Sequence, residues 1–168
     1  VQVVISMHMY PDYWMQQKVI QVPAAVRDHY GLEAYASMMD LSNDQLVFKW
    51  TDDYEKAFRA RESERNEVQK KLIKLVEKYQ VFEAIRMWSY LKIIPVKNDP
   101  RNNWYAPLSP EIMQIDSLAS DLPLRYFTAV HKASDDGKYG TAQDLLTDLK
   151  AWQRDIAPAS ILPSEKHV

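Results

Sequence analysis

Residues 51–91 read TDDYEKAFRARESERNEVQKKLIKLVEKYQVFEAIRMWSYL, a stretch without proline or glycine. Thr51 has the side chain of an N-cap, and the two carboxylates after it favour the positive end of a helix dipole. In the second half, large apolar side chains recur at steps of three and four, which places them on one helix face. The members of this apolar face are Val68, Leu72, Leu75, Tyr79, Phe82 and Ile85. The stretch therefore predicts a long central helix.

The same stretch contains a polar interval. An unbroken helix over residues 51–91 would run about 60 Å at 1.5 Å per residue, which is longer than a 168-residue globule is wide. The apolar pattern lapses over residues 59–67, where charges of both signs alternate. We therefore expect a break near Arg61–Arg65, or a helix that projects beyond the globule.

The segments before residue 51 carry weaker signals. Residues 3–9 are β-branched at their start and end before Pro11, which fits either a strand or the first turn of a buried helix. Pro23 favours a helix start and Gly31 a helix stop. We expect a short strand over residues 19–22, a helix over residues 23–30, a short helix over residues 33–39 and an edge strand over residues 45–50.

After residue 91 the pattern changes to extended chain and turns, and then returns to helices. Ser109 before Pro110 is typical of a helix start, with the serine as N-cap. We expect extended chain over residues 92–96, a turn over residues 98–103, a helix from residue 109, a restart at Pro123 capped by Asp121, a stop near Gly137 and a last helix from Thr141. The inward side chains of this hairpin are expected to be Leu124, Phe127, Val130, Ala142, Leu145, Leu149 and Trp152.

The composition is that of a globular protein. The chain is 46% hydrophobic and 26% charged, and its formal net charge of −2 leaves no basic excess for binding nucleic acid. No apolar run approaches the roughly 20 residues that span a bilayer. Zero cysteines exclude disulfides, thiolate metal sites, a cysteine nucleophile and a covalently attached c-type haem.

These segments predict a mostly α-helical fold with one long central helix, a C-terminal helical hairpin and two to four short strands. The length suits a single domain, which we place over residues 1–156. Residues 157–168 are polar and interrupted by proline, so we expect them to form a tail.

His8 is the one candidate for a cofactor ligand. It lies between Met7 and Met9, with Met15 nearby, and histidine and methionine together serve as haem axial ligands and soft-metal ligands. In a strand, however, the two flanking methionines would share one face and His8 would point to the other. We therefore expect the methionines to be structural and keep His8 as a weak candidate for binding a cofactor.

The other histidines favour structural roles. His29 falls at a helix end, where an imidazolium stabilises the terminal carbonyls. His131 and Asp135 are spaced to form a pair on one helix face, but no nucleophile accompanies them, so we expect a solvated surface pair. His167 falls in the tail. Phosphate-loop, dinucleotide, zinc-protease, serine-hydrolase and calcium-loop motifs are absent, so no catalytic residue and no metal ligand is predicted.

Three segments carry a family resemblance. They are PDYW at residues 11–14 with the strand at residues 19–22, LKIIPVKNDPRNNW at residues 91–104, and ILPSEKHV at residues 161–168. In this order they resemble an extracytoplasmic segment of the large fused cytochrome c biogenesis proteins of Bacteroidetes-type bacteria (System II, Ccs/Res type). The middle segment, with the pattern I-x-P-x-x-N-D-P-x-N-x-W, is the most specific; residues 35–40 and 60–66 are also similar.

The resemblance implies a part of a larger membrane protein. Full-length members export haem and present it to apocytochrome c, where thioether bonds form to a C-x-x-C-H motif. Their haem chemistry lies in transmembrane histidines and a tryptophan-rich loop, and no residue of this sequence matches those ligands. The resemblance thus implies a domain on the extracytoplasmic (periplasmic) side, with haem in the parent but not in this domain. It implies the remainder of the parent and apocytochrome c as partners, and a tail at residues 157–168 that leads towards a membrane helix.

Three functional hypotheses follow. The first is a non-catalytic accessory domain that supports haem delivery or apocytochrome c recruitment through protein contacts. The second is an independent haem-binding domain that uses His8. The third is a free-standing helical interaction protein. An enzyme would require a deep pocket that joins titratable side chains far apart in the sequence.

Overall fold

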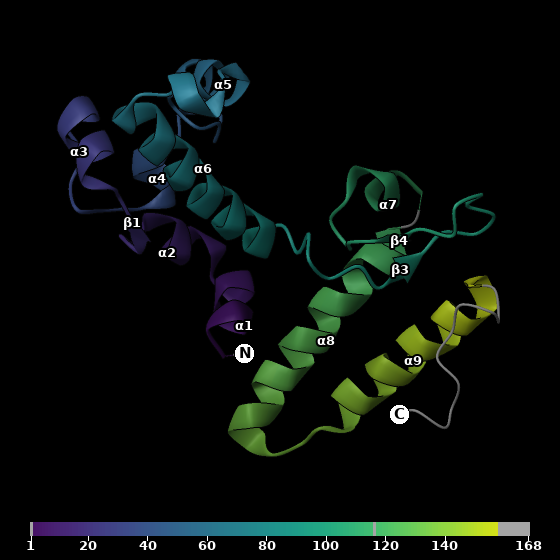
Figure 1. The fold of residues 1–168 in the computed structure, drawn as a ribbon. Helices are drawn as coiled ribbons and strands as arrows, with labels where there is room; N and C mark the ends of the chain where they lie inside the picture. The colour runs from purple at the N-terminus through teal and green to yellow at the C-terminus, as the bar shows by residue number, and fades with distance from the viewer. Residues whose placement is uncertain (1, 116, 158–168) are drawn as a thin grey trace. The chain divides into compact units, whose positions relative to one another are not determined.

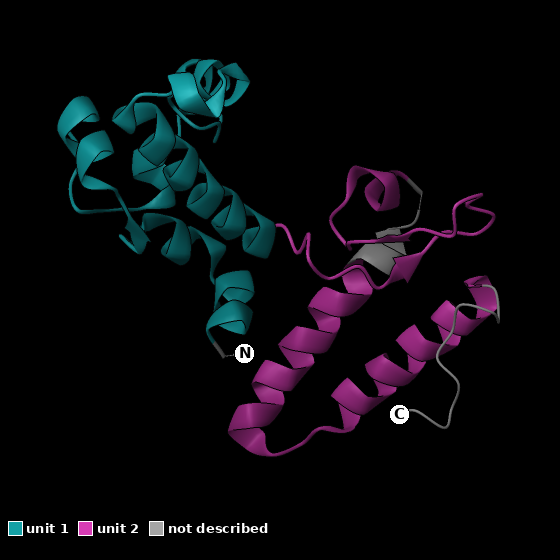
Figure 2. Cartoon of the chain, in the orientation of Figure 1, with its two compact units in different colours: residues 1–86 teal, residues 87–168 magenta. Residues whose placement is uncertain are grey.

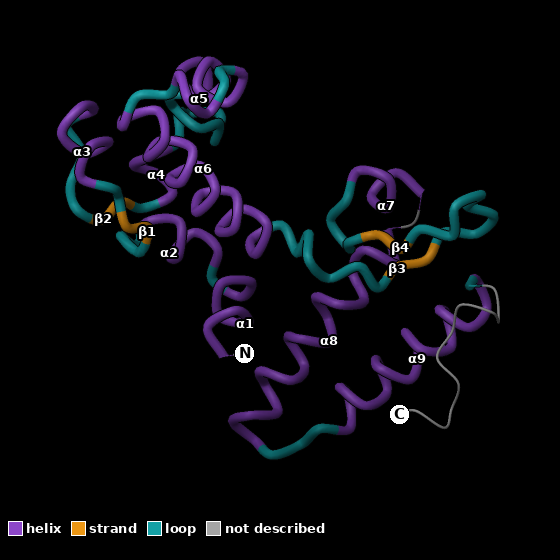
Figure 3. The backbone as a smooth tube through the Cα atoms, in the orientation of Figure 1, coloured by secondary structure: helices purple, strands orange, loops and turns teal. Residues whose placement is uncertain are grey.

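The structure is a computed structural model of the chain, and it describes residues 2–115 and 117–157 (Figure 1). The chain divides into two compact units, residues 1–86 and residues 87–168 (Figure 2). The mostly α-helical class with a few short antiparallel strands is confirmed (Figure 3). A compact unit need not fold independently, so the single domain over residues 1–156 stays a prediction. Residues 158–168 of the predicted tail lie outside the described part.

The first unit is built around the long helix α6, which confirms the predicted central helix. Strands β1 and β2 pair antiparallel, with Ile20 opposite Ala36. In chain order the elements are α1 (Gln2–Met9), α2 (Pro11–Gln16), β1 (Ile20–Gln21), α3 (Ala24–Tyr30), β2 (Tyr35–Ala36), α4 (Met38–Leu41), α5 (Thr51–Arg59), a 3-10 turn (Glu62–Glu64) and α6 (Glu67–Arg86).

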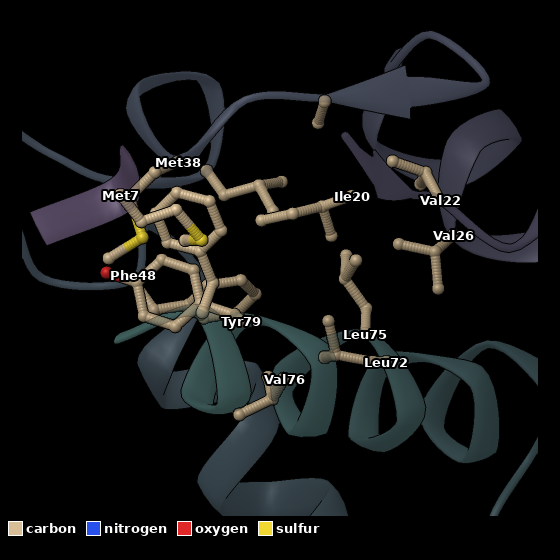
Figure 4. Packing of buried hydrophobic residues seen from close by; sticks show 13 residues of the cluster. Met7, Ile20, Val22, Val26, Met38, Phe48, Leu72, Leu75, Val76 and Tyr79 are labelled. Atoms are coloured by element: carbon tan, nitrogen blue, oxygen red, sulfur yellow. The ribbon is translucent and has the colours of Figure 1, made fainter. Parts of the chain in front are cut away.

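The apolar face of α6 forms the core of this unit. Its middle members Leu72, Leu75, Tyr79 and Phe82 are buried, as the spacing predicted, and the two end members are half-buried. Side chains from the preceding elements pack on this face (Figure 4), among them Met7, Ile20, Val26, Met38, Leu41 and Phe48. Burial of such side chains is the main favourable contribution to folding.

The predicted break within residues 51–91 is confirmed. α5 ends at Arg59 and α6 begins at Glu67. Asn66 and Gln69 define the new start, because each side chain accepts a hydrogen bond of 2.9 Å from the backbone N–H of the other. This reciprocal capping satisfies donors at the first turn of α6, so the polar interval starts a second helix instead of continuing the first.

The helix predicted over residues 33–39 is wrong. Tyr35–Ala36 instead forms strand β2, and the helix begins only at α4. Ser37 is the N-cap: its Oγ accepts from Asp40 N–H at 3.0 Å, and the Asp40 carboxylate accepts from Ser37 N–H at 2.8 Å. The capping box fixes the helix start after the segment that pairs with β1.

The edge strand predicted over residues 45–50 is also wrong. Asn43 Oδ1 accepts two backbone N–H bonds from this segment, at 3.0 and 2.9 Å, and Leu46 has a left-handed φ of 58°, so the chain turns back. The prediction that Thr51 is the N-cap of the helix after it is wrong as well. Thr51 is the first residue of α5, and its hydroxyl donates to the Phe48 carbonyl at 2.6 Å instead of accepting a helix N–H.

In the part that the structure describes, the second unit combines a small β-hairpin with helices. Its elements are β3 (Ile94–Pro95), β4 (Trp104–Tyr105), α7 (Pro110–Ile115), α8 (Ser117–Asp136) and α9 (Gly140–Ile156). α8 and α9 form the predicted helical hairpin (Figure 1). Ile94, Ile112 and Leu149 join β3, α7 and α9 in a small core, against which Trp152 packs.

Two predictions for α8 are corrected. The helix does not restart at Pro123 but runs through it without interruption. Proline removes one main-chain donor, but its fixed φ is helical, and here the ring is fully buried. Leu124 was expected to face inward and is 46% exposed, whereas Phe127 is half-buried and contacts the Trp88 ring at 4.8 Å. Among the described residues, none of the helices combines the length and hydrophobicity that crossing a bilayer requires.

Candidate functional site

His8 lies in a helix, since residues 2–9 form α1 and not a strand. The histidine is 8% exposed, and burial lowers its pKa from 6.5 to about 4, so the imidazole is neutral at physiological pH. Met7 is buried in the core of the first unit and Met15 packs against that core, which fits the structural role expected for the methionines. Within the described ranges, no group of three or more histidine, aspartate or glutamate side chains is placed to hold a metal ion.

A polar hollow of about 350 Å³ lies between α3, α5 and the start of α6. Tyr30 OH donates to Asp53 Oδ2 at 3.0 Å, and Lys56 Nζ lies 3.7 Å from the other carboxylate oxygen. Burial, together with the bond to Asp53, raises the pKa of Tyr30 to about 12. His29 sits in the last turn of α3, as predicted, with its ring edge-on to Tyr30 at 4.6 Å. The high pKa keeps the Tyr30 phenol protonated and the Asp53 carboxylate accepts its hydrogen bond, so neither of these two groups is activated as a nucleophile.

Of the two remaining histidines, His131 lies in the described part of the chain. His131 and Asp135 lie one turn apart on α8, as their spacing predicted. His131 is half-buried and Asp135 exposed, so their surface pairing stays a prediction. His167 falls outside the described residues.

The turn between β3 and β4 is held by one carboxylate. Asp99 Oδ1 accepts from Arg101 N–H at 2.7 Å, and Oδ2 accepts from Tyr105 OH at 2.6 Å. The Tyr105 bond lowers the pKa of Asp99 and raises that of Tyr105. Asn98 and Asn102 take left-handed φ values of 61° and 50°, a conformation that asparagine tolerates better than most residues. The segment with the most specific family resemblance, residues 91–104, therefore contains a turn whose conformation is held by hydrogen bonds to the Asp99 side chain.

Beside this hairpin lies a second hollow of about 460 Å³, which we call the β4 hollow. Its lining combines apolar and polar side chains from residues 87–111 and includes Met87, Lys92, Trp104, Leu108 and Glu111. α7 begins at Pro110 as predicted, but the Ser109 hydroxyl is buried without a hydrogen-bond partner in the described part of the chain, so it does not act as the expected N-cap.

Sequence reasoning missed both hollows. Tyr30 and Asp53 are 23 positions apart, and no periodicity links them. The local signal for the β4 hollow is Trp104, which follows the turn at residues 98–103 and belongs to the segment of family resemblance. Neither hollow includes His8.

Comparisons with known proteins do not assign the chain to a family. No model of a known protein family matches the chain, and a search of curated proteins finds no significant match.

Proposed function

We propose that the chain is an accessory extracytoplasmic domain of a membrane-bound System II cytochrome c biogenesis protein. In this role it supports haem delivery or apocytochrome c recruitment through protein contacts and catalyses no reaction itself. Haem belongs to the parent protein, and the partners are the remainder of that parent and apocytochrome c.

One observation carries this proposal. The segment that most closely resembles the family, residues 91–104, supplies β3, the Asp99 turn and Trp104, and it borders the β4 hollow. Side chains that fix a loop and leave an aromatic ring beside an open hollow are what a binding domain requires.

The frame that encodes the chain gives the first test. The proposal expects membrane-spanning segments in the same polypeptide, together with a tryptophan-rich haem loop. A frame without bilayer-crossing segments would overturn it and favour a free-standing helical interaction protein.

A second test uses the full-length parent in cells. Replacing residues 1–156 by a flexible linker should reduce covalent haem in c-type cytochromes, measured by haem-dependent peroxidase staining, while the parent still reaches the membrane. The exposed substitution Lys132→Gln, on α8 and outside residues 91–104, serves as the matched control and should leave the staining unchanged. Normal staining with the linker protein would contradict an accessory role.

An independent haem-binding domain remains the second candidate, because His8 is held neutral and neutral imidazole is the form that ligates metal. Our proposal expects no saturable Soret shift when haem is added to the purified chain. A saturable shift that disappears in His8→Ala would favour this alternative.

A further inference from the structure

We propose that the β4 hollow binds an extended polypeptide segment by taking up one large apolar side chain. The inference goes beyond the accessory role, because capture of a peptide by this surface does not depend on a membrane-bound parent. The hollow lies wholly within the second unit, so it is defined by that unit alone.

The size and walls of the hollow fit a side chain with its flanking backbone. Its volume of about 460 Å³ falls in the range of ligand pockets. Trp104 is half-buried and offers part of its ring, and Met87 and Leu108 add flexible apolar surface. Tryptophan presents a large, rigid contact area, and methionine adapts to differently shaped partners. These walls favour an aromatic or large aliphatic side chain.

The polar groups of the lining select the rest of the ligand. Within the described chain, Lys92 and Glu111 form no ion pair, and Trp104 Nε1 donates no hydrogen bond. The ammonium and the indole N–H are donors, whereas the Glu111 carboxylate is an acceptor. A plain anion would face Glu111 and a plain cation would face Lys92. A peptide backbone is neutral and supplies carbonyl acceptors and N–H donors together, so it complements both charges.

The hollow is also held in shape before any ligand arrives. The Tyr105 hydroxyl is bonded to Asp99, which fixes the strand that carries Trp104. A surface that is already ordered loses less entropy on binding.

The apolar walls and the two opposite charges together assign the occupant as an extended protein segment. A small aromatic molecule is the alternative that the experiment must separate from it.

The test follows the indole N–H signals of the full chain by heteronuclear NMR. The probe is an uncharged, acetylated and amidated nonapeptide of glycine, serine and alanine with one central phenylalanine. A matched peptide has alanine at the centre. The Trp104 signal is assigned by its loss in Trp104→Phe. We expect this signal to shift in a saturable way as the phenylalanine peptide is added. The alanine peptide should bind at least about tenfold more weakly, as judged by its dissociation constant.

Two variants test the location. Trp104→Ala should weaken binding about tenfold or more, as measured from other signals of residues 87–111. Ser89 is exposed and lines the hollow, so Ser89→Trp should fill it and abolish binding without disturbing the core. The matched control is Ser63→Trp, which places the same ring at an exposed serine outside the lining and should bind as the unchanged chain does.

Three outcomes would overturn the proposal. The first is an unshifted Trp104 signal at millimolar peptide. The second is equal binding by the alanine peptide or by Ser89→Trp. The third is binding of N-acetyl-phenylalaninamide as tight as that of the nonapeptide, which would assign the hollow to small aromatic molecules. None of these results bears on the membrane-bound parent, whose encoding frame tests the proposed function separately.

Discussion

Tyr105 OH donates to Asp99 Oδ2 over 2.6 Å and thereby ties strand β4 to the turn that precedes it. The same carboxylate accepts the Arg101 N–H at 2.7 Å, so one side chain closes the turn and orients the strand. A hydrogen bond that links a loop to a strand end limits how far the loop can open. Since Trp104 precedes Tyr105, this bond also fixes the position of the β4 hollow.

Tyr105→Phe should lower the urea midpoint of unfolding and loosen the turn. Because the pKa of Asp99 is lowered below its ordinary 3.8 in the folded chain, its contribution is complete above that value and is lost as the pH falls below it. The difference between the two proteins should therefore shrink in acid. Urea titrations at pH 7 and pH 3 measure it, and a difference that is equal at both pH values would contradict the assignment.

His8 should make the chain less stable in mild acid. Its pKa falls from 6.5 to about 4 on folding, so the stabilisation by the neutral ring is complete above pH 6.5 and is lost as the pH falls towards 4. His8→Gln removes this titration. Between pH 7 and pH 4 the unchanged chain should lose roughly 2 kcal/mol relative to the variant, a value discounted from the full shift for residual solvent screening.

Denaturant unfolding at several pH values measures the His8 effect, and the imidazole Cε1 proton signals report the pKa directly. A His8 signal that titrates near 6.5 would contradict the prediction. The variant His29→Gln is the control, because His29 is exposed on α3.

Arg65 should be worth more to stability than its exposed neighbour Arg61. The Arg65 guanidinium donates to the Ala60 carbonyl at 3.1 Å and to the Phe58 carbonyl at 2.9 Å, where α5 ends. Arg65→Met leaves these carbonyls to water and should cost about 1–2 kcal/mol of unfolding free energy. Arg61→Met should change it by less than about 0.5 kcal/mol. Equal effects in urea titrations would refute a specific role for the Arg65 bonds.

Local patterns explain why much of the helical fold could be predicted. The face of α6 follows from the spacing of Leu72, Leu75 and Tyr79 alone, because the helix period depends on neighbours three or four positions away. The break before Glu67 was visible as a loss of that spacing combined with a length that a small globule cannot hold. Such features depend only on residues that are close together in the sequence.

The failures have non-local or side-chain causes. Residues 33–39 look helical, but Ala36 pairs with Ile20 in a strand, and only the fold brings these two together. At residues 45–50 the apolar side chains alternate as in a strand. The Asn43 side chain nevertheless accepts hydrogen bonds from two backbone N–H groups of this segment, so the chain forms a turn. Backbone partners of this kind override a weak strand signal.

The candidate site was the least predictable part. The β4 hollow needs Lys92, Trp104 and Glu111 together, and the spacings between them match neither a helix nor a strand period. In the sequence, Trp104 stands out through the family resemblance and His8 through its methionine neighbours. Neither feature indicates whether the residue lines a hollow in the folded chain. Hollows arise where elements meet, and the order of elements in space is not a local property of the sequence.

Gly137 and Gly140, which bracket the turn between α8 and α9, should respond to alanine in opposite directions. Gly137 has a φ of 71°, and its N–H donates to the Ala133 carbonyl at 2.8 Å, so it ends α8 in the left-handed conformation. No atom within 4 Å would meet an added Cβ at either glycine, so the effects are those of the backbone alone. Gly137→Ala should destabilise the chain by about 1 kcal/mol, because alanine resists a positive φ. Gly140 is the first residue of α9, and Gly140→Ala should stabilise the chain by about 0.5 kcal/mol, because the unfolded chain loses freedom. Thermal and urea unfolding of the two variants measure the signs, and a stabilising Gly137→Ala would show that the turn is not held in the left-handed conformation.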